Sequence, residues 1–245
     1  MAAVVVAAVA PRELADFWAR ALRWNTRSVG GRAVALVPTD DVTTFRVLFA
    51  PGAHRHEKVG QNRIHFDLTT TSPTDQADSV YELEALGARR VDIGQGSDEP
   101  HVVLADPEGN ELCVIGPDNR FLASSPRLGA VNCDGTRALG RFYSDALGWP
   151  LVWDQDEETA IQAPDGTGPR VTWSGPPLMP RPVKERFHVH VAPARGVDAR
   201  SALDHLLVLG ATRRQRGTPC NDAIGLTDVD GNELCFTRSS ADAPP

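Results

Sequence analysis

The sequence is poor in the features that mark several classes of protein. Lysine occurs only at Lys58 and Lys184 among 25 basic residues, and no Lys/Arg-rich run appears. With a net charge of −7, this argues against nucleic acid or an anionic membrane as a partner. No apolar run approaches the roughly 18 residues of a membrane span. The four cysteines show no C-x-x-C spacing, which favours reduced thiols in a cytoplasmic protein.

The apolar start, residues 1–10, is the one stretch that looks like a targeting signal. It lacks a positively charged beginning and runs directly into Pro11-Arg-Glu, where an amphipathic helix is expected. We therefore predict a buried strand here. The remaining composition, 41% apolar and 23% charged, is typical of a globular protein.

The most informative feature that is present is an internal duplication. Asp106-Pro-Glu-Gly-Asn-Glu-Leu-Cys113 returns as Asp228-Val-Asp-Gly-Asn-Glu-Leu-Cys235, and Asn62-Arg-Ile-His65 returns as Glu185-Arg-Phe-His188. The Phe17-Trp18 helix returns as Phe142-Tyr143. The matches keep one order and nearly one spacing, so the 245 residues divide into two repeats, predicted as domains over 1–122 and 123–245.

Each repeat divides again into two similar units. Four strand-like runs (4–9, 64–68, 128–133 and 187–191) each precede a helical pattern and two or three further strand-like runs. Two of the helices are expected to begin at Ser72-Pro73 and Asp198 and to end at Gly87 and Gly210. The linkers 52–60, 116–126 and 176–182 are polar or Pro-rich, and the tail 241–245 is predicted to be disordered.

The predicted fold class is α+β, with four βαβββ modules. One such unit has a half-covered sheet, so two units are expected to join their sheets into a cup. Pairing of neighbours within each repeat would give two cup-shaped domains in the chain, as a monomer, and pairing between chains would give a homodimer.

These features together resemble the vicinal oxygen chelate superfamily, which includes glyoxalase I, bleomycin-resistance proteins and extradiol dioxygenases. The resemblance rests on the βαβββ pattern, the Asn-Arg-x-His motif and the Asp-Pro-Glu-Gly-Asn-Glu entry to a strand. It is strongest to the glyoxalase-like branch. It implies a small-molecule ligand and a divalent metal cofactor inside the cup.

The resemblance also implies which residues would hold that metal. His65 and Glu111 match the ligand positions of the second unit, and His188 and Glu233 match those of the fourth. The first and third units depart from the pattern: their first strands offer Val5, Ala7, Ala130 or Asn132, and their last strands carry no carboxylate. Half of the expected ligand set is therefore missing.

Strand alternation gives each cup a set of side chains on one face. These are His65, Asp67, Glu111 and Cys113 in the first cup, and His188, His190, Glu233 and Cys235 in the second. Three interpretations stay open for the histidines: a metal ligand, a contact to an organic ligand, or a buried hydrogen bond to the facing Glu, which predicts His65 close to Glu111 and His188 close to Glu233. The turn residues Asp106, Gly109 and Asn110 are expected to be structural.

Two tryptophans complete the predicted binding residues. Trp153 and Trp173 fall on strands of the third unit and would give the second cup an aromatic wall. The best functional prediction is a small-molecule-binding protein of the glyoxalase and bleomycin-resistance type. The alternative is a metal-dependent lyase, isomerase or dioxygenase that acts on a vicinal-oxygen substrate, so the sequence leaves open whether the protein is an enzyme.

Overall fold

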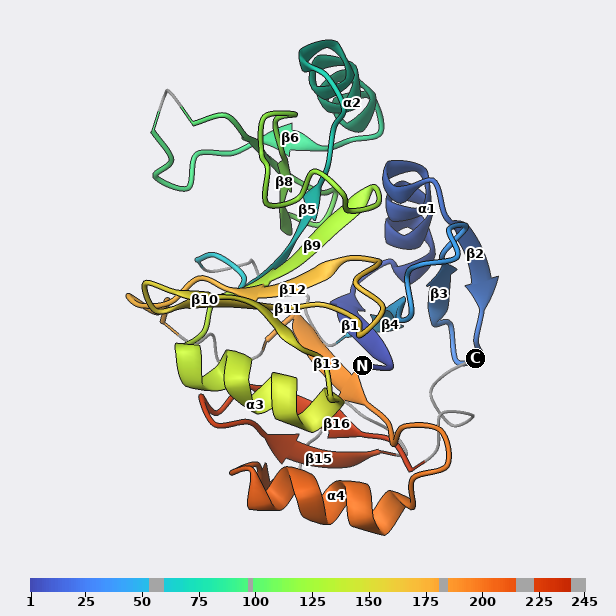
Figure 1. Cartoon of the computed structure of the whole chain (residues 1–245). Coiled ribbons are helices and arrows are strands. Elements are labelled where there is room, and N and C mark those ends of the chain that lie inside the picture. Colours follow the sequence, from blue (N-terminus) through green and yellow to red (C-terminus); the bar gives the residue numbers. More distant parts are fainter. Residues whose placement is uncertain (53–59, 97–98, 181–184, 215–222, 239–245) are drawn as a thin grey trace.

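The computed structural model describes residues 1–52, 60–96, 99–180, 185–214 and 223–238 (Figure 1). Parts of the predicted linkers 52–60 and 176–182, and the tail 241–245, lie outside this range. None of the helices in the described part is both long and apolar enough to cross a membrane.

The element order repeats four times. The first unit contains β1 (Ala3–Ala8), α1 (Pro11–Leu22), β2 (Asn25–Ser28), β3 (Val34–Val37) and β4 (Arg46–Pro51). The second contains β5 (Ile64–Leu68), α2 (Pro73–Ala85), β6 (Arg89–Arg90), β7 (Val102–Ala105) and β8 (Glu111–Val114). The third contains β9 (Leu128–Cys133), α3 (Arg137–Leu147), β10 (Leu151–Gln155), β11 (Glu158–Ile161) and β12 (Arg170–Trp173). The fourth contains β13 (Phe187–Val191), α4 (Ala199–Val208), β14 (Thr212–Arg213), β15 (Ile224–Thr227) and β16 (Glu233–Phe236). The predicted βαβββ organisation is confirmed.

Local sequence accounts for the helix boundaries. The side chains of Ser72, Thr136 and Asp198 each accept a hydrogen bond from a backbone N–H in the first turn of their helix. The start of α1 has no such side chain at its N-cap, but Pro11 occupies its first position, where no backbone donor is lost. Gly148 ends α3 in the left-handed conformation that glycine adopts without strain.

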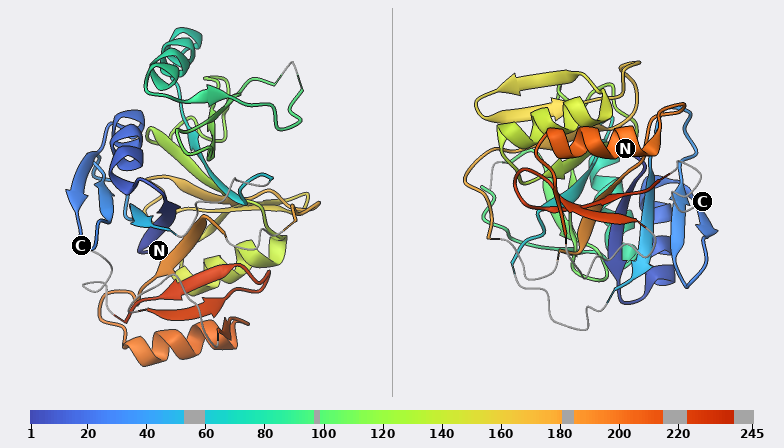
Figure 2. Two further views of the ribbon diagram at one scale, coloured as in Figure 1. Left: turned by 180° about the vertical axis from the view of Figure 1, so that it is seen from behind. Right: turned by 90° about the horizontal axis from the view of Figure 1, so that it is seen from below.

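The four units form two sheets, and each sheet takes one unit from each repeat. Sheet A has the order β14-β15-β16-β13-β1-β4-β3-β2, and sheet B the order β10-β11-β12-β9-β5-β8-β7-β6. The blue start of the chain therefore lies beside its orange and red end (Figures 1 and 2). The expectation that neighbouring units within a repeat pair is wrong: the first unit pairs with the fourth, and the second with the third.

Strand alternation separates the two faces of each sheet. On sheet A, Val4 and Val6 of β1 face α1 and join a core cluster that also includes Phe66 and Val131 of sheet B. Ala3 and Val5 lie on the other side, in a small separate cluster. The core is thus shared by the helix-covered faces of both sheets. We call the opposite side of each sheet its helix-free face.

The repeated Asp-x-x-Gly-Asn turn joins the two sheets. Asp106 accepts hydrogen bonds from the backbone of Asn110 at 2.9 Å and from the indole N–H of Trp18 on α1 at 3.0 Å. Glu108 of the same turn accepts from the backbone N–H of Ala10 at 2.8 Å and so caps α1. Gly109 has φ 86°, which the turn requires. The predicted structural role of this turn is confirmed.

The second copy of the turn makes the same contacts to α3. Asp228 accepts from the backbone of Asn232 at 2.8 Å and from the Tyr143 hydroxyl at 3.4 Å. Asp230 accepts from the backbone N–H of Thr136 at 2.7 Å, at the start of the helix. Each turn therefore fixes the helix that belongs to the neighbouring sheet.

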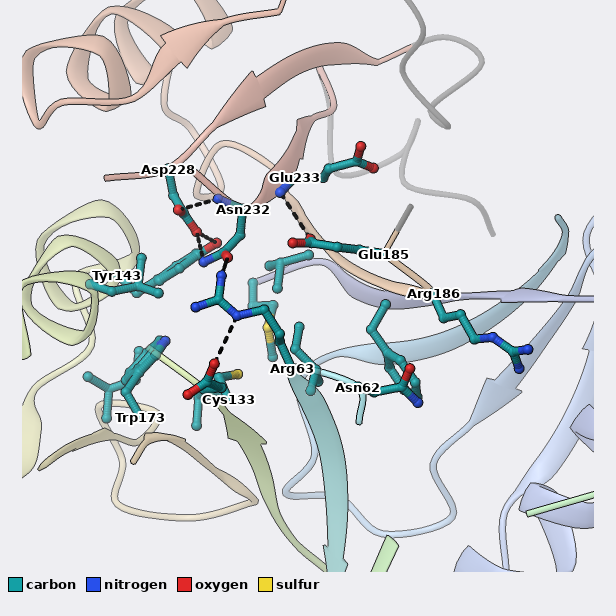
Figure 3. Close-up of a pocket in the computed structure, with 18 of the residues that line it drawn as sticks. Asn62, Arg63, Cys133, Tyr143, Trp173, Glu185, Arg186, Asp228, Asn232 and Glu233 are labelled. Carbon is teal, nitrogen blue, oxygen red and sulfur yellow. Dashed lines mark hydrogen bonds and ion pairs between the residues drawn. The ribbon is translucent and has the colours of Figure 1, made fainter. Parts of the chain in front are cut away.

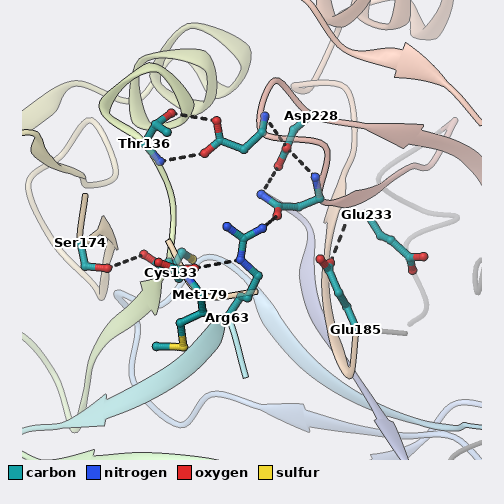
Figure 4. A network of polar contacts seen from close by, with 11 residues as sticks. Arg63, Cys133, Thr136, Ser174, Met179, Glu185, Asp228 and Glu233 are labelled. Carbon is teal, nitrogen blue, oxygen red and sulfur yellow. Dashed lines mark hydrogen bonds and ion pairs between the residues drawn. The ribbon is translucent and has the colours of Figure 1, made fainter. Parts of the chain in front are cut away.

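Two arginines reach across the same junction in opposite directions. Arg63, before β5, donates to the Asn232 side chain at 2.7 Å and forms a buried ion pair with Asp134 at 2.9 Å (Figure 4). Its repeat counterpart Arg186, before β13, donates to the Asn110 side chain at 3.3 Å. The arginine of the Asn-Arg-x-His motif thus binds the asparagine of the other repeat's turn.

Removal of the Arg63 side chain should destabilise the protein strongly. Arg63→Ala leaves the Asp134 carboxylate buried without its ion-pair partner, and we expect a loss of about 3–5 kcal/mol in the free energy of unfolding. Urea titration followed by circular dichroism measures it. Arg90→Ala, which breaks an exposed ion pair with Glu84, is the control and should cost about 0–1 kcal/mol. Equal losses in the two variants would contradict the role given to Arg63.

Candidate functional site

The helix-free face of sheet A brings His188 and His190 together beside an apolar wall. The register places His188 opposite Val5 and His190 opposite Ala3. The wall consists of Ala3, Val5, Ala35 and Leu48. The two imidazole rings lie 5.1 Å apart between centroids. Both histidines are buried, so this face presents two polar rings within apolar surroundings.

Three nitrogens of these rings have no hydrogen-bond partner in the described part of the chain. They are Nε2 of His188 and both Nδ1 and Nε2 of His190. Burial lowers the pKa of His188 to about 3, helped by the neighbouring His190 and the charge of Arg214. Burial also lowers the pKa of His190 to about 4. Both rings are therefore neutral at pH 7 and have hydrogen-bonding capacity to offer a ligand.

The other two residues predicted for this face have different partners. Glu233 forms an ion pair with Arg214, and Nε2 of His188 makes no hydrogen bond to it. Cys235 is disulfide-bonded. The prediction of reduced thiols is wrong for Cys235, whereas Cys113 and Cys133 are free.

On the helix-free face of sheet B the histidine is protonated, unlike the two neutral histidines of sheet A. His65 Nε2 lies 3.4 Å from the carboxylate of Asp67. Burial acts to lower the pKa of His65, but hydrogen bonds to Asp67 and Cys113 and the charge of Asp67 outweigh it and raise the pKa to about 10. His65 is an imidazolium at pH 7, held by a neighbouring carboxylate.

Glu111 lies on the same face, but its carboxylate forms a hydrogen bond with the backbone. The register pairs Asp67 with Cys113, and its continuation places His65 and Glu111 on the same face of neighbouring strands. The carboxylate of Glu111 accepts a hydrogen bond from the backbone N–H of Asn62 at 3.2 Å. Asp67 is the carboxylate that forms an ion pair with His65, and the structure groups His65 with Asp67 and Cys113.

The two tryptophans do not form the expected wall beside His188. Both belong to sheet B, and they lie on opposite faces of it. Trp173 is buried on the helix-covered face, where it stacks on Tyr143 with 5.4 Å between ring centroids. Trp153 lies on the helix-free face with His65, because the row of paired residues runs from Trp153 through Ala160, Thr172 and Asn132 to His65. The prediction of an aromatic wall for the second cup is wrong.

Sequence reasoning missed two residues near Trp153. Phe121, from the segment between β8 and β9, meets Trp153 edge-on at 5.9 Å. The Arg170 guanidinium lies over the same Phe121 ring at 4.2 Å. The sequence did contain a signal for Arg170, because an arginine, Arg46, occupies the matching position in the first unit. Phe121 lies in a predicted linker, and no pattern singled it out.

Comparison with known proteins assigns the chain to a family. The model of the glyoxalase-like domain matches residues 3–115 and again 130–237, so the chain belongs to this family as a tandem repeat. No curated protein matches the sequence.

Solved structures agree on the fold. The chain is similar to glyoxalase I from Zea mays, with a TM-score of 0.68 and 13% identity over 99% of this chain and 92% of that one. It is also similar to a putative dioxygenase from Bacillus subtilis, with a TM-score of 0.55 and 15% identity over 98% of this chain and 86% of that one.

The divalent metal that the family implies does not fit the donors on either face as a full ligand set. On sheet A, the Cys235 sulfur is in a disulfide, so the group of His188, His190 and Cys235 supplies two imidazoles. On sheet B, His65 carries a proton, which a metal would have to displace. The facing strands β1 and β9 carry no carboxylate or histidine toward these groups.

The neutral histidines of sheet A should make the protein sensitive to acid. Their folded pKa values lie below the unfolded value of 6.5, so the unfolded chain binds more protons and stability falls as pH drops from 6.5 to 4. Each histidine adds a slope of up to about 1.4 kcal/mol per pH unit. Urea titrations should therefore show a flatter pH dependence for the double variant His188→Gln/His190→Gln. Val208→Gln, at an exposed position on α4, is the control and should leave the slope unchanged.

The charge of His65 should depend on Asp67. In Asp67→Asn the carboxylate is gone and burial remains, so the imidazole should lose its proton below its usual pKa of about 6.5. NMR of the histidine Cε1 protons across pH about 6 to about 9 should show His65 titrating only at the alkaline end in the unmodified protein. A normal His65 titration in the unmodified protein would contradict the assigned ion pair.

Proposed function

We propose that this protein binds a small organic molecule on the helix-free face of sheet A. The observation that carries the proposal is the set of buried imidazole nitrogens on His188 and His190 that have no partner in the described part of the chain. Burial of a polar group without a hydrogen bond costs about 1–3 kcal/mol, and buried polar groups in proteins are nearly always satisfied. A ligand that supplies the missing hydrogen bonds would offset this cost.

The surroundings favour a ligand of mixed character. The wall of Ala3, Val5 and Leu48 suits an apolar body, and the neutral imidazoles suit hydroxyl or carbonyl oxygens. The electrostatic influence of Arg214 on His188 adds positive potential beside these rings. We therefore infer an oxygen-bearing organic compound with an apolar portion. This agrees with a binding role of the glyoxalase and bleomycin-resistance type.

A metal-dependent lyase, isomerase or dioxygenase is the second candidate function. It is supported by the closeness of the His188 and His190 nitrogens, which lie within 4.8 Å of one another, and by their neutral state. Binding is favoured over catalysis because neither face assembles the full ligand set that the family resemblance implies.

A ligand screen tests the proposal directly. Thermal-shift measurements with a panel of hydroxy- and oxo-substituted aromatic and aliphatic compounds should identify compounds that stabilise the protein. His188→Gln and His190→Gln should each lower the affinity of the protein for such a compound by about 5- to 150-fold, which corresponds to about 1–3 kcal/mol of binding free energy. The matched variant His65→Gln, on the other sheet, should have no effect.

Two outcomes would overturn this assignment. Loss of binding in His65→Gln but not in His188→Gln would place the working site on sheet B. One equivalent of metal retained after dialysis against a chelator, lost in His188→Gln, would favour the metal-dependent enzyme.

We further infer that residues 1–122 and 123–245 are the duplicated units, and that the chain acts in the cytoplasm as a monomer or a homodimer. Light scattering after size-exclusion chromatography distinguishes the two assemblies. Cell fractionation tests the location, and an oxidising compartment would instead agree with the disulfide at Cys235.

A further inference from the structure

A cavity opens between the two sheets, on the side opposite to both helix-free faces. It is open to solvent, and the empty space in it and at its mouth amounts to about 640 Å³. Figure 3 shows Tyr143 and Trp173 on one side of it and Glu185, Arg186 and Asn62 on another. Its apolar lining includes Ile64 of β5 and Val189 of β13, the central strands of the two sheets.

The internal duplication explains why the cavity exists. Trp18, Phe66 and Phe187 fill one junction between α1 and the two sheets, with edge-to-face contacts at 5.1 and 5.7 Å. Their repeat counterparts at the other junction are Tyr143, Val189 and Ile64, because the sequence offsets pair Trp18 with Tyr143, Phe66 with Val189 and Ile64 with Phe187. All three counterparts are smaller, and all three line the cavity. The junction beside α1 is therefore filled by aromatic rings, whereas the corresponding junction of the other repeat is left open as the cavity.

The lining of the cavity carries both signs of charge. Arg63 is paired with Asp134 at 2.9 Å, and Arg186 and Glu185 follow one another on the opposite side (Figure 3). Asp228 and Glu233 also line the cavity, but burial raises the pKa of Asp228 and Glu233 is paired with Arg214, so most of the charge already has a partner and an ionic ligand is not favoured. The lining also includes the rings of Trp173, Tyr143 and Phe187, and aromatic rings gain from edge-to-face and stacked contacts with another ring.

We propose that this cavity is a second binding site, separate from the helix-free faces, and that its ligand is a small neutral aromatic molecule. Such a ring would take the place that Phe66 and Trp18 occupy at the matching junction. Well-packed interiors contain few voids larger than a water molecule, and an apolar cavity in a protein accepts small aromatic compounds. The proposal does not depend on the function assigned to His188 and His190.

Fluorobenzene is a suitable probe because its ¹⁹F signal reports binding directly. Titration of the full chain should give a saturable shift in the unmodified protein. Val189→Phe, which copies Phe66 into the cavity, should weaken binding at least tenfold while the protein stays folded by circular dichroism and urea titration. Val208→Phe is the matched control, because it makes the same substitution at an exposed position on α4 and should leave binding unchanged.

Further variants keep the test decisive. If Val189→Phe does not fold, Tyr143→Trp serves instead, since the Trp18 indole already donates to the equivalent aspartate at 3.0 Å. His188→Gln should not change fluorobenzene binding, which separates this cavity from the proposed ligand face. Absence of saturable binding, or binding that a folded Val189→Phe or Tyr143→Trp variant retains in full, would overturn the proposal.

Discussion

The two sheets are held in position by the reciprocal contacts of Arg63 and Arg186. Each arginine precedes the central strand of one sheet and donates to an asparagine in a turn of the other, Asn232 or Asn110. Both contacts are partly buried, and Arg63 also forms a buried ion pair with Asp134. A buried ion pair adds little net stability, since desolvation offsets much of the attraction, but a wrong arrangement would leave its charges without a partner. These contacts therefore select one arrangement of the sheets. The caps on α1 and α3, the shared core and the cavity all depend on that arrangement.

The duplication gave two similar frameworks, and single positions decide how they differ. Asp67 and His190 occupy the same place in the two repeats, two residues after a histidine on the same face. Asp67 raises the pKa of His65, whereas burial beside His190 lowers the pKa of His188. One face therefore offers an imidazolium with a carboxylate, and the other two neutral imidazoles. The same framework thus presents two different chemistries.

The sequence predicted local structure well because its signals are local. The boundaries of several elements were predicted to within a few residues. The signals were capping residues such as Ser72 and Asp198 and the alternation of strands β5, β9 and β13. The pairing of units was not predictable in this way. It depends on contacts such as that of Arg63 with Asn232, 169 residues apart, and the four similar units allow more than one pairing. The predicted position of Trp173 was wrong for the same reason. The face of the sheet on which its side chain lies depends on the register of β12 with β9.

The central strands connect the proposed ligand face with the cavity. Side chains alternate along a strand, so His188 and His190 point to the helix-free face of sheet A while Val189 between them lines the cavity. On β5 the neighbours Ile64 and His65 are divided in the same way. A ring seated against Val189 is therefore one peptide unit from the two imidazoles. The two proposed sites therefore lie on opposite faces of one strand, and the alternation of its side chains keeps their linings separate.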